Sequence, residues 1–136
     1  MLELIGNVFL SAATISYLGP FTGAYREPVI KAWKEKFTEL GIPFSENYSL
    51  AETLQTPLKI REWIIEGLSN DALSIDNGVI ATKCQRWPLF IDPQSEAHKW
   101  IKKHEEKHNL KIINFSETHF LKTIQTAIGS GYSVLL

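Results

Sequence analysis

The stretch that decides the fold is Arg86-Trp87-Pro88-Leu89-Phe90-Ile91-Asp92-Pro93-Gln94-Ser95-Glu96-Ala97-His98-Lys99-Trp100. Its apolar run, residues 89–91, predicts a strand, Asp92-Pro93 predicts a turn, and the charged residues that follow have helical periodicity. Strand, loop and helix in this order form the place where a P-loop protein binds phosphate. This loop, however, lacks the glycines of such a protein, and neither Ser nor Thr follows its lysine. The strand–loop–helix position suits a nucleotide, but the side chains of the loop do not suit phosphate and Mg²⁺.

The side chains at the phosphate-binding position argue against a nucleotide. If Lys99 is aligned with the lysine that binds phosphate, His98 replaces a glycine and Trp100 replaces the hydroxyl that would hold Mg²⁺. Two carboxylates in the loop repel a triphosphate, and its proline has no N–H to donate. We expect no ATP binding or hydrolysis here, and we expect Lys99 to be a packing or surface lysine. The degenerate position comprises Asp92, Pro93, Gln94, Ser95, Glu96, Ala97, His98, Lys99 and Trp100.

Two further apolar runs follow the loop. Helical periodicity continues to about residue 108, and residues 110–115 then predict a second strand. Ser116 is a suitable N-cap for the next helix, whose buried stripe is predicted to be Phe120, Leu121, Ile124 and Ile128. Residues 133–136 predict a third strand. Strands that alternate with helices predict an α/β fold with parallel strands and flanking helices.

Helices and turns alternate before the loop. Ser49, with Glu52 at capping-box spacing, predicts a short helix, and a longer one follows Thr56-Pro57. The longer helix is predicted to end near Gly67 and to bury Ile60, Trp63, Ile64 and Leu68. Turn-prone residues then predict an irregular lead-in over residues 69–82, with a brief apolar strand or helix edge at 79–81.

The N-terminal third predicts helices only. Residues 2–18 are so generally apolar that they predict a helix buried on most of its surface. A second helix is predicted to begin near Arg26-Glu27-Pro28, to end at Gly41 and to bury Ile30, Trp33, Phe37 and Leu40. The polar loop that follows predicts the domain boundary. We expect an all-helical segment over residues 1–44 and a truncated α/β domain over residues 45–136.

Composition excludes several classes of partner. The chain has 136 residues, a net charge of -1 and a pI near 6.4, which gives no electrostatic reason to expect nucleic acid. A single cysteine excludes an internal disulfide and fits a reducing compartment. No apolar run approaches the roughly 20 residues needed to cross a bilayer, so we expect a cytosolic protein without membrane partners. The strand-like end at residues 133–136 suggests a fragment of a longer chain.

The sulfur and indole side chains have ordinary explanations as packing residues. Lone intracellular cysteines are mostly small core residues, and we expect this of Cys84. The tryptophans fall on inward stripes of predicted helices or beside a predicted strand, so we expect packing rather than a ligand platform. They are Trp33, Trp63, Trp87 and Trp100.

The segment His104-Glu105-Glu106-Lys107-His108 offers a different function, that of a zinc hydrolase. Two histidines one helical turn apart, with a glutamate between them, suit the Zn²⁺ site of such an enzyme. The segment is polar all round, however, and no third ligand is evident because His119 belongs to another predicted helix. We therefore expect a solvated helix end and no metal. The sequence is also compatible with a free-standing small nucleotide-binding protein and with an unrelated α/β interaction domain.

Several ordered motifs resemble one family of motor proteins. The N-terminal part resembles the segment of dynein heavy chains that returns from the microtubule-binding stalk into the motor ring, through Leu4-Ile5-Gly6-Asn7-Val8, Ser11-Ala12-Ala13, Tyr17-Leu18-Gly19-Pro20-Phe21-Thr22 and Tyr25-Arg26. The rest resembles the start of the fifth AAA+ module of these chains, through Trp63, Gly67-Leu68-Ser69-Asn70-Asp71, Ser74-Ile75-Asp76-Asn77-Gly78, Arg86-Trp87-Pro88-Leu89, Ile91-Asp92-Pro93-Gln94 and Lys99-Trp100-Ile101-Lys102. The resemblance covers nearly the whole sequence and favours the axonemal over the cytoplasmic type.

The resemblance implies an incomplete, P-loop-like AAA+ large subdomain preceded by a helical segment. The fifth module of the family is understood to lack a working nucleotide site, which agrees with the composition of the loop from Asp92 to Trp100. Many relatives have Gly-Gln where Ser95-Glu96 stands here, and proline is common where Ser69 stands. The first of these departures adds charge to the loop and weakens any case for ATP further.

The resemblance also implies a function and partners. The chain would be a structural ring module of a microtubule-based, ATP-driven motor, and it would relay conformational change without binding ATP itself. ATP and Mg²⁺ would bind other modules, so we expect no cofactor and no catalytic residue in this segment. The implied partners are the neighbouring AAA+ modules, the microtubule through the stalk, and the dynein intermediate and light chains. The implied location is the cytoplasm and cytoskeleton, in the axoneme of a cilium or flagellum.

Overall fold

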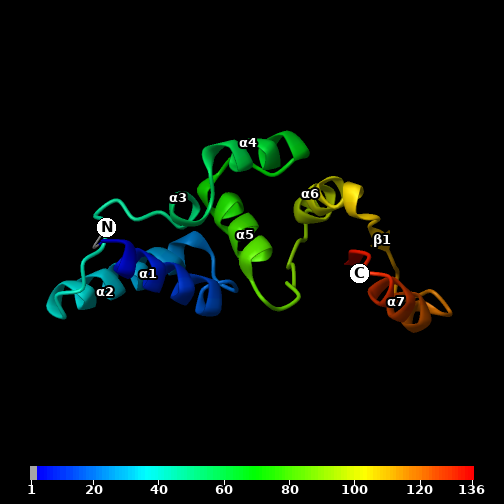
Figure 1. The fold of residues 1–136 in the computed structure, drawn as a ribbon, viewed down its shortest axis with the longest axis horizontal. Helices are drawn as coiled ribbons and strands as arrows, with labels where there is room; N and C mark the ends of the chain where they lie inside the picture. Colours follow the sequence, from blue (N-terminus) through cyan, green and yellow to red (C-terminus); the bar gives the residue numbers. More distant parts are fainter. Residues whose placement is uncertain (1–2) are drawn as a thin grey trace.

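A computed structural model gives the fold and describes residues 3–136. Figure 1 shows α1, α2 and α3 near the N-terminus at one end of the molecule, and β1 and α7 near the C-terminus at the other. None of the helices within the described residues is long and apolar enough to cross a membrane. The elements are α1 (Glu3–Tyr17), α2 (Gly23–Glu39), α3 (Leu50–Leu54), α4 (Pro57–Glu66), α5 (Ala72–Lys83), α6 (Glu96–His104), the 3₁₀ helix η1 (Glu106–His108), β1 (Lys111–Ile112), α7 (Phe120–Gly129) and β2 (Val134–Leu135).

Helix α1 buries one narrow face. Its buried residues are Gly6, Leu10, Ser11 and Thr14. Five large hydrophobic side chains of the same helix are exposed, namely Leu4, Ile5, Val8, Phe9 and Tyr17. The prediction of a helix buried on most of its surface is therefore wrong: apolar residues occur all round the helix, but neighbouring elements cover only one side. Leu2, the predicted first residue of this helix, lies outside the described residues.

The buried face of α1 packs closely on the loop that follows α2. The backbone N–H of Gly6 donates to the carbonyl of Pro43 at 3.1 Å. A Cβ atom at Gly6 would lie 2.4 Å from that oxygen, so only glycine permits the approach. The side chain of Asn7 holds the same loop, because it donates to the Ser45 hydroxyl at 2.8 Å and accepts from the Ser45 amide at 2.9 Å.

Helix α2 begins at Gly23, earlier than predicted, and contains Pro28 within it. The earlier start places Arg26 against the C-terminal end of α1, where it is only 4% exposed. Its guanidinium donates to the carbonyls of Leu18 and Gly19, both at 3.0 Å. It also donates to the side-chain oxygen of Asn77 in α5 at 2.6 Å. A buried cation thus joins α1, α2 and α5.

The predicted cap of α3 is confirmed, and α4 has a cap of the same kind at Thr56. The Ser49 hydroxyl accepts from the Glu52 amide, and the Thr56 hydroxyl accepts from the Lys59 amide, both at 3.3 Å. Helix α4 ends at Gly67, whose φ of 108° lies in the left-handed region that favours glycine. Short-range capping signals are therefore reliable in this part of the sequence.

The predicted irregular lead-in over residues 69–82 is wrong, because most of it forms helix α5. The Asp71 carboxylate caps this helix by accepting from the Ser74 amide at 2.9 Å. Gly78 lies inside α5 and is buried, and a Cβ atom there would lie 3.3 Å from the Trp63 ring. The glycine that suggested a turn is explained by close packing of α5 on this indole.

The core joins four helices around two indoles. Trp63 of α4 and Trp100 of α6 are 0% and 1% exposed, and their ring centroids lie 5.7 Å apart in an edge-to-face arrangement. Val79 of α5 and Leu50 and Ala51 of α3 complete the buried cluster. Trp87, by contrast, is 88% exposed, so the prediction that it packs inside the fold is wrong.

The sheet is smaller than predicted. Strands β1 and β2 pair in parallel, with Lys111 opposite Val134 and Ile112 opposite Leu135, which confirms two of the three expected strands as a short parallel pair. Residues 89–91 form no strand, and Leu89 and Ile91 are 90% and 84% exposed. No other strand pairs with this run within the described residues, so its backbone has no partner for strand hydrogen bonds.

The helix after β1 also begins later than predicted. Helix α7 starts at Phe120, after a turn in which the amide of Asn114 donates to the Glu117 carboxylate at 3.1 Å. Ser116 is therefore not the N-cap, because the turn precedes the helix. Of the predicted stripe, Leu121 and Ile128 are exposed, and the buried residue of α7 is Ala127.

Candidate functional site

The loop between α5 and α6 folds back on itself at its end. The amide of Ser95 donates to the backbone carbonyl of Asp92 at 3.2 Å, which closes a turn around Pro93 and Gln94. Ser95 has a φ of 58°, in the left-handed region where glycine is preferred. Helix α6 begins directly afterwards at Glu96. The turn brings the Asp92 carboxylate to the N-terminus of α6.

Both carboxylate oxygens of Asp92 accept hydrogen bonds from α6. The amide of Glu96 donates to one oxygen at 3.0 Å, and the amide of His98 donates to the other at 2.9 Å. Free N–H groups at a helix N-terminus are the groups with which a protein binds a phosphate. Here an internal carboxylate occupies two of them.

The other residues of the degenerate position differ in their burial and contacts. Lys99 is predicted to be either a packing lysine or a surface lysine. It is exposed, so it is a surface lysine. The Glu96 carboxylate accepts from the Ser69 hydroxyl at 3.2 Å. Trp100, which stands where a magnesium-binding hydroxyl would be needed, is a buried core residue. Pro93, Gln94, Ser95 and His98 are exposed, and Ala97 is half-buried.

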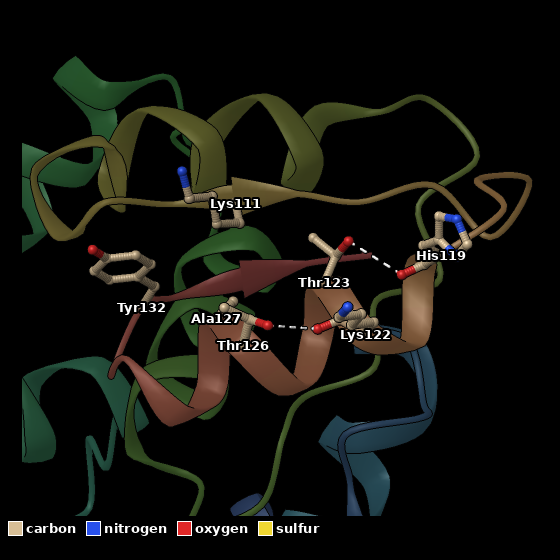
Figure 2. A pocket seen from close by; sticks show the side chains of 7 residues that line it. All are labelled: Lys111, His119, Lys122, Thr123, Thr126, Ala127 and Tyr132. Atoms are coloured by element: carbon tan, nitrogen blue, oxygen red, sulfur yellow. Dashed lines mark hydrogen bonds between the residues drawn. The ribbon is translucent and has the colours of Figure 1, made fainter.

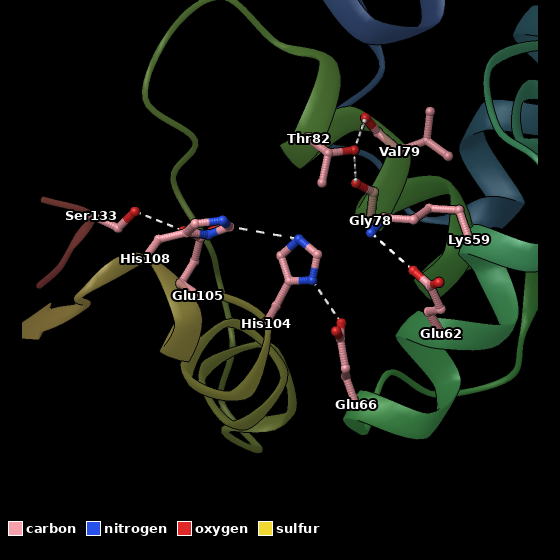
Figure 3. Close-up of polar contacts among 10 residues, drawn as sticks. All are labelled: Lys59, Glu62, Glu66, Gly78, Val79, Thr82, His104, Glu105, His108 and Ser133. Atoms are coloured by element: carbon pink, nitrogen blue, oxygen red, sulfur yellow. Dashed lines mark hydrogen bonds and ion pairs between the residues drawn. The ribbon is translucent and has the colours of Figure 1, made fainter. Parts of the chain in front are cut away.

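The two histidines that suggested a zinc site both lie near Glu105, but Nδ1 of each faces a different carboxylate (Figure 3). Helix α6 ends at His104, so His104 and His108 do not lie on one continuous helical face. Nδ1 of His104 lies 2.6 Å from the Glu66 carboxylate, and Nδ1 of His108 lies 3.0 Å from the Glu105 carboxylate. Within residues 3–136, no three His, Cys, Asp or Glu side chains are grouped as metal ligands.

His104 belongs to the core rather than to the solvated helix end that its polar neighbours predicted. Its imidazole stacks on the Trp100 ring, with centroids 5.3 Å apart and an interplanar angle of 27°. Only 14% of its side chain is exposed. The prediction of a solvated end is therefore wrong for His104, but His108 is exposed.

Comparison with known proteins identifies the family. The family model described as the ATP-binding dynein motor region matches residues 61–136. The chain belongs to this dynein family. It is 41% identical over 134 residues to dynein axonemal heavy chain 6 of Homo sapiens, and 44% identical over the same length to dynein axonemal heavy chain 3 of Mus musculus. Each match covers 98% of this chain but only 3% of the relative.

A hollow of the dynein segment lies away from the Asp92 loop, between α7 and the β strands (Figure 2). This open cavity of about 380 Å³ is lined by Lys111, His119, Lys122, Thr123, Thr126, Ala127 and Tyr132. Two of the hydroxyls already donate to their own helix: Thr123 to the His119 carbonyl at 3.2 Å, and Thr126 to the Lys122 carbonyl at 2.9 Å. The cavity therefore presents cations but no free hydroxyl donors from these threonines.

Sequence reasoning missed two structural carboxylates of the dynein segment. Asp92 enters that reasoning as a turn residue and a repulsive charge, although an Asp shortly before a helix is also an N-capping signal. Glu105 links the start of η1 to the segment just before β2, because its carboxylate accepts from the Ser133 hydroxyl at 2.7 Å. No local pattern predicts this second contact, since it joins residues 28 positions apart.

We expect the Glu105 contact to make the stability of the dynein segment sensitive to acid. Burial opposes ionisation, but hydrogen bonds from Ser133 and His108 and the nearby charges of His108 and His104 outweigh it, so the pKa of Glu105 lies below its ordinary value. A carboxyl with a depressed pKa stabilises the fold above its unfolded-state pKa, and this contribution is lost as the pH falls through the folded-state pKa.

The variant that tests this expectation is Glu105→Gln. Its stability should fall less than that of the parent between about pH 5 and pH 3, measured by urea unfolding at each pH. Glu106→Gln, at the neighbouring exposed position, serves as the control and should follow the parent curve. Identical acid profiles for the parent and Glu105→Gln would contradict the assignment.

Proposed function

We propose that this chain is a structural module of a dynein motor ring. It would consist of a helical segment on the stalk side and the first part of an AAA+ large subdomain. The module would neither bind nor hydrolyse ATP, and the ATP and Mg²⁺ of the motor would bind elsewhere in the heavy chain. Family membership supports the ring assignment, and the axonemal relatives support a cytoskeletal location in an axoneme.

One observation supports the absence of a nucleotide more than any other. The Asp92 carboxylate occupies the Glu96 and His98 amides at 3.0 and 2.9 Å. A phosphate at this helix end would have to displace a carboxylate that is covalently part of the loop and is therefore always present at high local concentration. It would also meet the negative charges of Asp92 and Glu96 at close range.

Buried contacts between distant segments support a mechanical role. Arg26 connects the N-terminal helices to α5 through Asn77, 51 positions away in the chain. The edge-to-face pair of Trp63 and Trp100 connects α4 to α6. Well-packed interiors resist gradual deformation, so helices joined in this way move together when one of them is displaced. The proposed partners are neighbouring AAA+ modules, the microtubule through the stalk, and the intermediate and light chains, with no role for nucleic acid or membrane.

The direct test is nucleotide titration of an intact motor ring whose other nucleotide sites are blocked. We expect no binding of Mg·ATP at the Asp92 loop at millimolar concentration. Clear binding there, followed through the amide signals of Glu96 and His98, would overturn the proposal of a structural module.

A second measurement concerns the internal cap itself. Asp92→Ala should lower the free energy of unfolding by about 1 kcal/mol and should accelerate hydrogen exchange of the Glu96 and His98 amides, because both lose their acceptor. Asp71→Ala removes the cap of α5 and is the matched control, with a similar loss of stability but no change in exchange at α6. Unchanged exchange at both amides in Asp92→Ala would show that the carboxylate does not hold them.

A further inference from the structure

Strand β1 has one free edge. Its ladder to β2 uses the amides of Lys111 and Ile113, which donate to the carbonyls of Ser133 and Leu135 at 2.8 and 2.9 Å. Along a strand, the backbone N–H and C=O groups of successive residues point to alternate sides. The N–H and C=O of Ile112 therefore point away from β2, and β1 is the last strand on that side of the described sheet.

A basic groove lies along this region. The groove, of about 460 Å³, is lined by α6, by the η1 turn and by β1. Its charged lining consists of four lysines and one glutamate, namely Lys99, Lys102, Lys103, Lys111 and Glu106. Within residues 3–136, neither Lys99 nor Lys102 forms a salt bridge. Lys103 differs, because it donates to the Ile65 carbonyl at 2.9 Å.

The helix dipole explains only part of this charge. Lysines in the last turn of α6 complement the negative end of the helix, and this accounts for Lys102 and Lys103. Lys99 lies near the beginning of the nine-residue helix, where the dipole does not favour a cation. Lys111 lies on β1 itself, where a lysine disfavours pairing with an apolar or cationic strand.

We propose that this groove binds an acidic, extended polypeptide segment, which adds to β1 as a further strand. The segment exchanges backbone hydrogen bonds with the N–H and C=O of Ile112, and its carboxylates lie beside Lys99, Lys102 and Lys111. Backbone pairing provides affinity in such strand addition, and the lysines select for negative side chains. The site shares Lys99 with the degenerate position, but the other residues that line the groove lie outside the loop from Asp92 to Trp100.

The probe is a fluorescent eight-residue peptide that alternates Glu with Val, titrated into the 136-residue chain at low salt. We expect saturable binding by anisotropy, and slower hydrogen exchange of the Ile112 amide when the peptide is bound. The same peptide with Lys in place of Glu should not bind. Inorganic pyrophosphate should not compete at equal concentration; effective competition would mean a small-anion site and would overturn the proposal.

The variants separate charge from backbone pairing. Lys99→Gln with Lys102→Gln should weaken binding about fivefold, whereas the control pair Lys31→Gln with Lys83→Gln, which changes the net charge equally at exposed positions elsewhere, should change it less than about twofold. Ile112→Pro removes the edge N–H without removing a bond to β2, and it should abolish most of the binding measured by anisotropy. If binding is as tight in Ile112→Pro as in the parent, or if the control pair weakens it as much as the groove pair, the proposal is wrong.

Discussion

Replacing Trp63 with alanine is expected to lower the free energy of unfolding by about 3–5 kcal/mol, enough to unfold much of the chain. The indole is fully buried, and its ring centroid lies 5.7 Å from that of Trp100 and 6.4 Å from that of His104. It also contacts α5 at Gly78, where no side chain can refill the space. A cavity in this place separates α4 from both α5 and α6, and urea unfolding measures the loss.

Two controls make the Trp63 result specific. Trp87→Ala removes the same side chain from an 88% exposed position and should change stability by less than about 0.5 kcal/mol. Trp63→Phe keeps an aromatic ring against Trp100 and removes an indole N–H that has no hydrogen-bond partner within the described residues, so it should cost about 1 kcal/mol. Equal effects of Trp63→Ala and Trp87→Ala would mean that the two indoles do not differ in burial.

Local signals in the sequence predict local structure well. Ser49, Thr56 and Gly67 mark helix ends by contacts within four residues, so the sequence contains all the information that these caps need. The stripe containing Trp63 is correct in part, because Trp63 is buried whereas Ile60, Ile64 and Leu68 are half-buried. Two predicted parallel strands are confirmed, although each is only two residues long. The division at residues 44 and 45 stays a prediction.

The errors arise where a distant segment decides the outcome. Gly78 resembles a turn residue in the sequence, but the close approach of Trp63 from another helix explains it inside α5. Residues 89–91 have the composition of a strand, but a strand also needs a hydrogen-bonding neighbour, which sequence alone does not provide. The apolar residues of α1 predict burial, yet burial depends on what covers each face. At the candidate site, the repulsive charge of Asp92 is evident from the sequence, but its two bonds to α6 are not.

The second large effect is expected at Arg26. Arg26→Ala should lower the free energy of unfolding by about 2–3 kcal/mol, because a buried guanidinium is lost that donates to the buried carbonyl of Leu18 and to two acceptors nearer the surface, the Gly19 carbonyl and the side-chain oxygen of Asn77. Arg26→Lys should recover less than half of this, since one ammonium cannot reproduce the planar geometry of the guanidinium. Arg61→Ala, at an exposed position in α4, is the control and should be nearly neutral.

The neighbouring Asp76 adds a pH dependence that a simple packing defect would lack. Burial raises the pKa of the Asp76 carboxyl, and the charge of Arg26 partly opposes that rise. A carboxyl with a raised folded-state pKa destabilises the fold once the pH exceeds its unfolded-state pKa, because ionisation is then easier in the unfolded chain. Removing Arg26 raises the pKa further, so the cost of Arg26→Ala should be larger at about pH 7 than at about pH 4, where unfolded aspartate is half protonated. Urea unfolding of the parent and the variant at both pH values tests this. An equal cost at both would remove Asp76 from the explanation and leave Arg26 as a donor to backbone carbonyls and Asn77 alone.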